Sequence, residues 1–336
     1  MNKALKPGIV YSLLVGGLLG LAGCSAKTPL PIPSPADRLG AIPADAVKMT
    51  PSEDKFLPVV HLEDWESPVL MPGGINTAGG EDSPFISPDG KRFFFFFTPD
   101  VSVPAEKQLF DGVTGIWWSQ MEAQGWSEPT RVILNDDLAL DGCPFARGDV
   151  LWFCSARVGN LKEIDIYTAT LEQGLWGNWQ NAGEQLNLEI IIGEMHISMD
   201  SQELIFHNHW QKGYPEEYSG DIDLWAIYKQ GDGWGPPVNL GPQVNNAEYD
   251  GWPFLSSDGS ELWFTSVSRL GYQGPAVFRS FRQTDGSWGT PVEVVSNFAG
   301  EPTLDDQGNL YFVHHYFDGE GNMIEADIYV AWRRLP

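Results

Sequence analysis

Five acidic residues are candidates for chemistry because each stands at the start of a short apolar segment. They are Asp82, Asp141, Glu194, Asp250 and Glu301. Carboxylates that gather in one place raise one another's pKa, and a cation, a basic ligand or a shared proton usually offsets them. The acids therefore indicate a site if the fold brings them together. The alternative is that each acid accepts backbone N–H bonds and fixes its own loop.

The acids mark copies of one repeated unit. Each acid is followed by a short strand, a tight turn and a second, strongly aromatic strand. Successive copies are separated by 60, 52, 57 and 50 residues. Units of about 40 to 60 residues made of short strands and turn residues are typical of β-propeller blades. The sequence therefore predicts an all-β protein, a five-bladed β-propeller over residues 57–336.

The fifth copy ends at Pro336, directly after its third strand. A counterpart of the missing fourth strand lies near the N-terminus, because the segment from Trp65 to Pro84 has the same spacing as the segment from Trp234 to Pro253. We expect this N-terminal strand to complete the last blade and close the ring. Closure would remove the exposed edges that an open sheet presents.

The turn sequences resemble those of a known repeat. Ser87-Pro88-Asp89-Gly90-Lys91-Arg92, which precedes a run of phenylalanines, and the segment 256–264 look like the TolB-type, WD-like propeller repeat. The resemblance covers nearly all of residues 57–334. It implies the fold rather than the function, since this repeat serves many binding roles.

Three of the acids also resemble a catalytic set. Asp82, Asp141 and Glu194 are similar to the series in five-bladed arabinanase- and xylosidase-type glycoside hydrolases, and Gly193-Glu194-Met195-His196 resembles the sequence around the acid of that family. The resemblance implies Asp82 as general base, Asp141 as orienting residue and Glu194 as general acid. Other residues interrupt the Asp-Pro pairs of the family in the first two copies. The fourth and fifth copies carry acids that this triad does not require.

In a propeller, the loops that enter the inner strand and those that follow the second strand lie on one face. We therefore expect the acids to ring one mouth of a central channel, with aromatic and histidine side chains beside them. The predicted ligand-binding residues are Asp250, Glu301, Trp252, His196 and Trp210.

Histidines near the same mouth are candidate ligands for a cation. His207 and His209 alternate along a strand and so point to one side, and His315 belongs to the last copy. Imidazole beside carboxylates suits Zn²⁺, whereas oxygen ligands alone suit Ca²⁺. The sequence thus indicates a divalent cation, Ca²⁺ or Zn²⁺, near the channel mouth. Histidines in solvated loops are the alternative.

Cys143 and Cys154 flank a turn almost symmetrically, so we expect them to face each other across a hairpin. Opposed residues of an antiparallel pair lie about 4.5 to 5.5 Å apart at Cα, which is within the range of a disulfide. Two buried thiols are the alternative.

The N-terminus has the features of an exported lipoprotein. Residues 1–23 combine two lysines with an apolar stretch that is too short to span a membrane, as in a signal peptide. Leu21-Ala22-Gly23-Cys24 resembles the bacterial lipobox, which implies attachment to the membrane through a lipid on Cys24. Ser25 in place of Asp implies the outer membrane of a two-membraned bacterium, or otherwise the cell surface. Residues 24–56, with the lipidated Cys24, are predicted to form a Pro/Ala-rich tether.

The net charge of −25 makes nucleic acid a poor partner. The sequence therefore predicts a lipid-anchored protein of the bacterial cell envelope, whose propeller binds a ligand, a neutral glycan or an envelope protein at an acidic channel mouth. One alternative is a glycoside hydrolase that uses Asp82, Asp141 and Glu194. The other is a scaffold of an envelope complex. Binding is favoured over catalysis.

Overall fold

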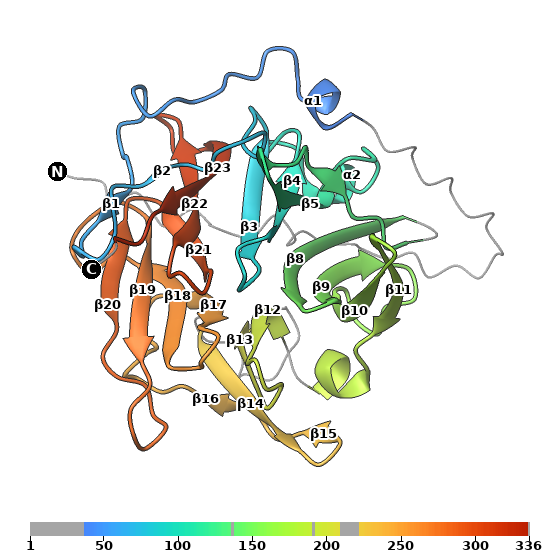
Figure 1. Cartoon of the computed structure of the whole chain (residues 1–336), viewed down its shortest axis with the longest axis vertical. Helices are drawn as coiled ribbons and strands as arrows, with labels where there is room; N and C mark the ends of the chain where they lie inside the picture. The colour runs from blue at the N-terminus through green and yellow to red at the C-terminus, as the bar shows by residue number, and fades with distance from the viewer. Residues whose placement is uncertain (1–36, 136–137, 190–191, 209–221, 335–336) are drawn as a thin grey trace.

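The computed structural model describes residues 37–135, 138–189, 192–208 and 222–334. Within these ranges the protein is built almost entirely of β-strands, and its sheets are arranged around a central axis (Figure 1). The helical elements are α1 (Arg38–Ala41), α2 (Ala105–Gln108) and a π-helical turn, Gln185–Glu189. No helix in this part of the chain has the length and apolarity that crossing a membrane requires. The predicted signal peptide and Cys24 lie outside the described residues.

The largest sheet joins the two ends of the described chain. One half contains β3 (Gly80–Ile86), β4 (Arg92–Thr98), β5 (Gly115–Glu122), β6 (Gly125–Trp126) and β7 (Thr130–Arg131). The other half contains β21 (Ala299–Leu304), β22 (Leu310–Phe317), β23 (Met323–Ala331) and β2 (Val69–Leu70). Pairing within each half is antiparallel, and one parallel contact between β23 and β3, Ala326 opposite Gly80, joins the halves.

Three further antiparallel sheets complete the arrangement. One contains β8 (Ala139–Arg147), β9 (Val150–Arg157), β10 (Asp165–Glu172) and β11 (Leu175–Asn181). The next contains β12 (Ile192–Ile197), β13 (Glu203–Asn208), β14 (Leu224–Gln230), β15 (Gly233–Trp234) and β16 (Val238–Asn239). The last contains β17 (Asp250–Leu255), β18 (Glu261–Val267), β19 (Pro275–Phe281), β20 (Val292–Ser296) and β1 (Val59–Val60). Figure 1 shows that the strands nearest the axis are β3, β8, β12, β17 and β21.

The turns that follow the innermost strands form because their side chains bond locally. Ser87 Oγ donates to Asp89 at 2.6 Å, and Ser256 Oγ donates to Asp258 at 2.7 Å. Such bonds replace backbone partners in a tight turn. Gly90, which follows Asp89, has a φ of 69°, a backbone conformation that residues other than glycine rarely adopt. The sequence Ser-x-Asp-Gly thus fixes the register of the hairpin.

The aromatic second strands supply the packing between sheets. All five phenylalanines of β4, 93–97, are buried. The Phe94 ring lies 5.7 Å from Trp118 in its own sheet and 5.6 Å from Trp176, which belongs to β11 of the next sheet. Buried aromatic pairs of this kind contribute about 0.5–1.5 kcal/mol each beyond their area. The phenylalanine run is therefore core rather than ligand contact.

The two ends of the described chain pair with each other, as the sequence predicts. Val69 and Leu70 of β2 lie opposite Val330 and Tyr329 of β23. The Asn76 side chain also bonds both backbone groups of Ile328, at 2.8 and 2.9 Å. The sequence did not indicate β1, which adds a further strand to β20.

The segment predicted to be the tether is partly packed on the sheets. Arg38 is buried, donates to the Ile75 carbonyl at 3.0 Å and lies over the rings of Phe95 and Phe97. Further along, Lys48 bonds the carboxylates of Glu325 and Asp327. Composition alone does not reveal this docking, because it depends on contacts of two basic side chains with residues that are far away in the sequence.

Candidate functional site

Each innermost strand carries a bulge at the same height along the axis. In each bulge, two residues of the innermost strand lie opposite a single residue of the neighbouring strand. The paired residues on either side of the bulges are Asp82 and Phe85, Gly142 and Phe145, Ile192 and Met195, Gly251 and Phe254, and Gly300 and Thr303. Four bulge residues have positive φ and precede a proline, which lacks the N–H that a regular ladder needs. These four are Ser83 (45°), Cys143 (52°), Trp252 (51°) and Glu301 (55°).

Residues of the five bulges surround a cavity of about 50 Å³ on the axis. Three consecutive residues from each innermost strand line it: 83–85, 143–145, 194–196, 252–254 and 301–303. A space of this size accommodates water or a small ion, whereas sites for organic ligands usually measure about 300–1,000 Å³. The first residues of the five triplets form the rim of the cavity: Ser83, Cys143, Glu194, Trp252 and Glu301.

The third residues of the triplets form an apolar layer below the rim. Phe145 lies 5.6 Å from Phe85 and 4.7 Å from His196, and His196 lies 4.6 Å from Phe254, between ring centroids. Burial lowers the pKa of His196 to about 3, so its imidazole is neutral. Its Nδ1 accepts the Leu255 N–H at 3.2 Å. His196, a predicted ligand-binding residue, thus lines the cavity as a member of an aromatic layer.

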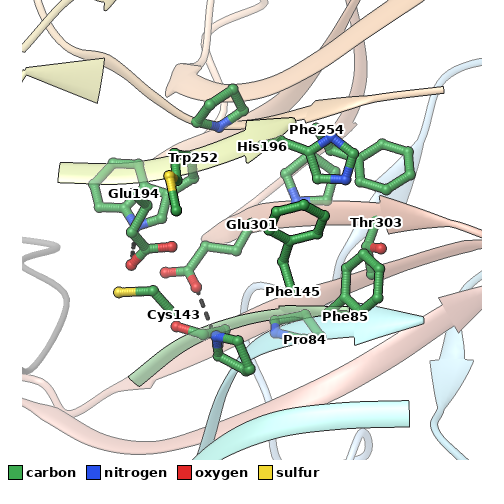
Figure 2. A pocket seen from close by; sticks show the side chains of 15 residues that line it. Pro84, Phe85, Cys143, Phe145, Glu194, His196, Trp252, Phe254, Glu301 and Thr303 are labelled. Carbon is green, nitrogen blue, oxygen red and sulfur yellow. Dashed lines mark hydrogen bonds between the residues drawn. The ribbon is translucent and has the colours of Figure 1, made fainter. Parts of the chain in front are cut away.

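Acidic and aromatic groups meet at the rim (Figure 2). Trp252 Nε1 donates to Glu194 Oε1 at 3.2 Å. The Ser83 N–H donates to Glu301 Oε2 at 3.0 Å and to Asp82 Oδ1 at 2.8 Å, and so holds two carboxylates together. Figure 2 shows Glu194 and Cys143 on one side of Glu301 and the aromatic layer on the other.

The carboxyl groups at the rim are close to one another and shielded from water. Burial raises the pKa of Glu301 well above its usual value, and the neighbouring Asp82 and Glu194 add to the rise. Burial also raises the pKa of the Cys143 thiol, with smaller contributions from Cys154, Glu194 and Glu301. A cationic group that entered the rim would relieve this repulsion.

Asp141 and Asp250 occupy a different position from the rim acids. Both stand two residues before the bulge residue, as Glu81 does in β3. Asp141 accepts from Ser155 and Arg157, each at 2.6 Å, and Asp250 accepts the Asn246 N–H at 2.6 Å. Burial raises the pKa of Asp250 to about 6. Asp250 therefore fixes its own loop, which is the alternative that the sequence left open, whereas Asp141 is held by side chains of the neighbouring strand β9.

The predicted histidines are separated in the structure. His315 Nε2 lies 4.0 Å from Asp82 Oδ1, beside the rim. The His207 ring stacks 5.1 Å from Trp252, on another part of the site. His209 and the predicted ligand contact Trp210 lie outside the described residues.

The cysteines contribute to the rim in a way that the sequence did not indicate. The bulge places Gly142, rather than Cys143, opposite Cys154. Both cysteines are free thiols, and Cys143 is the rim residue of β8. One feature of the sequence could have identified Cys143 as a rim residue. Ser83, Cys143, Trp252 and Glu301 each directly precede a proline in the repeat.

Comparisons with known proteins concern the fold alone. No family model and no curated protein sequence matches the chain. TolB from Acinetobacter baumannii is 14% identical over 76% of this chain and 55% of its own length, with a TM-score of 0.41. The α-L-arabinofuranosidase from Lactobacillus brevis is 8% identical over 75% of this chain and 90% of its own, with a TM-score of 0.41. The xylan β-1,4-xylosidase from Bacillus halodurans is 11% identical over 75% of this chain and 52% of its own length, with a TM-score of 0.43. The chain therefore has distant structural similarity to TolB propeller domains and to propeller glycoside hydrolases, and the strands described above make its fold mostly β.

Proposed function

We propose that this chain is a five-bladed propeller that binds a positively charged group of a partner at its acidic rim. The blade number is supported by the five innermost strands, each of which gives three consecutive residues to one cavity. If the single parallel contact between β23 and β3 is a seam between neighbouring blades, the nine-stranded sheet is two blades.

One observation carries the binding proposal: Glu194 and Glu301 converge on a small axial cavity beside an indole. The Trp252 ring borders the cavity, and an aromatic face stabilises a nearby cation by about 0.5–2 kcal/mol. The volume of about 50 Å³ suits an ammonium or the end of a guanidinium group. A Lys or Arg side chain of an envelope protein satisfies both requirements.

The other predicted functions have less support from the geometry. A glycoside hydrolase that uses Asp82, Asp141 and Glu194 needs two carboxyl groups on either side of a sugar ring. Here Asp141 is held by Arg157, and the rim cavity is smaller than a sugar. A neutral glycan offers no positive charge to the rim acids. A pure scaffold role would not require a cavity lined by acids.

Calorimetric titration with tetralysine, and with tetraglutamine as the neutral comparison, tests the binding proposal. We expect tetralysine to bind and to bind more weakly at higher salt, because exposed electrostatic attraction is screened. Glu194→Gln should lower the affinity about 10- to 100-fold, since a hydrogen bond to a charged group contributes about 1.5–3 kcal/mol. Glu122→Gln, which removes the same charge from an exposed hairpin position, is the matched control.

Equal binding of both peptides, or equal affinity of the wild type and Glu194→Gln, would refute the proposal. Release of product from aryl arabinosides or xylosides, lost in Glu194→Gln, would support the hydrolase alternative instead.

Attachment to the cell envelope is part of the same proposal and depends on Cys24. Labelling of cells with a radioactive fatty acid should mark the wild-type chain and not Cys24→Ser. Label retained on the variant would exclude Cys24 as the lipid site.

A further inference from the structure

Three buried side chains lie together beside the rim, where the ends of the described chain meet. Asp82 is on β3, Glu301 on β21 and His315 on β22. Each offers one ligand atom, and these atoms all lie within 4.8 Å of one another. We propose that these three side chains form a binding site for one divalent transition-metal ion of the zinc class.

The hydrogen bonds of Glu301 leave one of its carboxylate oxygens for a ligand. Oε2 accepts the Ser83 N–H at 3.0 Å, whereas Oε1 accepts no N–H of the described residues, and the carboxyl group lies against that of Asp82. Glu301 is only 5% exposed. A buried carboxylate oxygen without a partner is costly, and coordination of a metal ion would remove that cost.

The charge of the cluster also lacks a counterpart within the described part of the chain. No Lys or Arg side chain described here forms an ion pair with Asp82 or Glu301, and the nearest basic group of Asp82 is His315. Three other buried acids have a basic partner, since Asp141 pairs with Arg157, Asp250 with Arg269 and Glu325 with Lys48. A divalent ion would neutralise the two carboxylates of the cluster.

The kind of donor selects the class of metal. Ca²⁺ takes six to eight oxygen ligands, whereas imidazole with carboxylates suits Zn²⁺ and similar ions. The neutral imidazole is the form of histidine that binds metal. The sequence predicted His207 and His209 as further ligands, but His207 lies against Trp252 and outside this cluster.

The distances require only small movements of side chains. Ligands of a tetrahedral zinc ion, at about 2.0–2.1 Å from the metal, lie about 3.3 Å from one another. His315 Nε2 and Asp82 Oδ1 are 4.0 Å apart, and rotation about the side-chain bonds can close this gap. The backbone is fixed on both sides, since the His315 N–H donates to the Phe298 carbonyl at 3.0 Å and the Glu301 N–H donates to Thr265 Oγ1 at 2.7 Å.

The test uses the full-length protein, stripped with a chelator and titrated calorimetrically with Zn²⁺ alone. We expect one Zn²⁺ per chain and no comparable binding of Ca²⁺. Glu301→Gln and His315→Gln should each weaken zinc binding at least about 100-fold, because even the loss of an outer-shell partner costs about 10–100-fold. Two matched controls, His61→Gln and Glu122→Gln, change the same residue types outside the cluster and should leave the affinity unchanged.

X-ray absorption of the zinc-loaded wild type gives a result that does not depend on the folding of variants. The proposal expects nitrogen and oxygen neighbours that include one imidazole, and no sulfur. A sulfur neighbour would assign the metal to Cys143 or Cys154 and overturn the proposal, as would the absence of stoichiometric zinc binding. Unchanged affinity in a folded His315→Gln would also overturn it. The titration contains no peptide, so its outcome is independent of the proposed binding of a basic partner.

Discussion

Lys48 is the residue whose replacement tests most directly whether the N-terminal segment stabilises the sheets. Its Nζ bonds Glu325 and Asp327, whose side chains are 1% and 0% exposed. Replacing Lys48 by Met leaves both carboxylates buried without their cation. Breaking a buried ion pair usually costs about 3–5 kcal/mol. The Lys48 side chain is 33% exposed and partly screened, so we expect about 2 kcal/mol in the free energy of unfolding.

The loss should depend on pH in a defined direction. Burial raises the pKa of Glu325 from 4.5 to about 7, more strongly than Lys48 lowers it. The folded state therefore holds a proton between those values that the unfolded chain has lost. This proton contributes stability that is complete below about pH 4.5 and lost as the pH rises through about 7. Protonation of Glu325 removes the charge that Lys48→Met leaves unpaired. The difference in the free energy of unfolding between the wild type and Lys48→Met should therefore be smaller at pH 5 than at pH 8.

Urea unfolding followed by tryptophan fluorescence at both pH values measures these differences. Lys55→Met removes the same charge from an exposed position in the same segment and serves as the control. If Lys48→Met and Lys55→Met unfold at the same urea concentration at pH 8, the docking of the segment contributes no stability. A deficit of equal size at both pH values would refute the argument from protonation.

The remaining predictions concern the axis and the loop acids. His196→Phe should cost about 1 kcal/mol at pH 7, because the Leu255 N–H loses its acceptor. Below pH 6.5 only the unfolded chain binds a proton on His196, so the stability of the wild type should fall relative to that of the variant by about 1.4 kcal/mol per pH unit. Equal pH dependence of the two proteins in urea unfolding would contradict this. Arg157→Met should cost about 3 kcal/mol by leaving Asp141 unpaired, and Asp141→Asn in the same chain should recover part of it. Strictly additive losses in the double variant would show that the two side chains do not interact.

The parts of the fold that follow from local sequence were predictable. The spacing of the turns indicated the hairpins, and the match between the Trp65 and Trp234 segments indicated the pairing of β2 with β23. The docking of residues 38–54 was not predictable in this way. It depends on contacts such as Arg38 with the Ile75 carbonyl and Lys48 with Glu325, which are far apart in the sequence.

The site was predictable in position but not in register. The sequence placed the acids of all five copies in one set, although Glu194 and Glu301 stand at the bulge and Asp141 and Asp250 stand two residues before it. The bulge adds an extra residue to the inner strand and interrupts its alternation, so counting positions along the sequence does not show which side chains line the channel. Alignment of Pro302 with the prolines of the other copies would have placed Glu301 correctly.

The repeated bulge has a consequence for how the chemistry of the axial opening can change. Its backbone conformation is set by the following proline and by the hairpin, and it occurs with Ser83, Cys143, Trp252 and Glu301 alike. The chemical identity of the rim is therefore largely independent of the stability of the scaffold. A single codon change at any of these positions can alter the charge, size or reactivity of the opening without a new backbone, so the same architecture is able to acquire different partners by stepwise exchange of a few side chains.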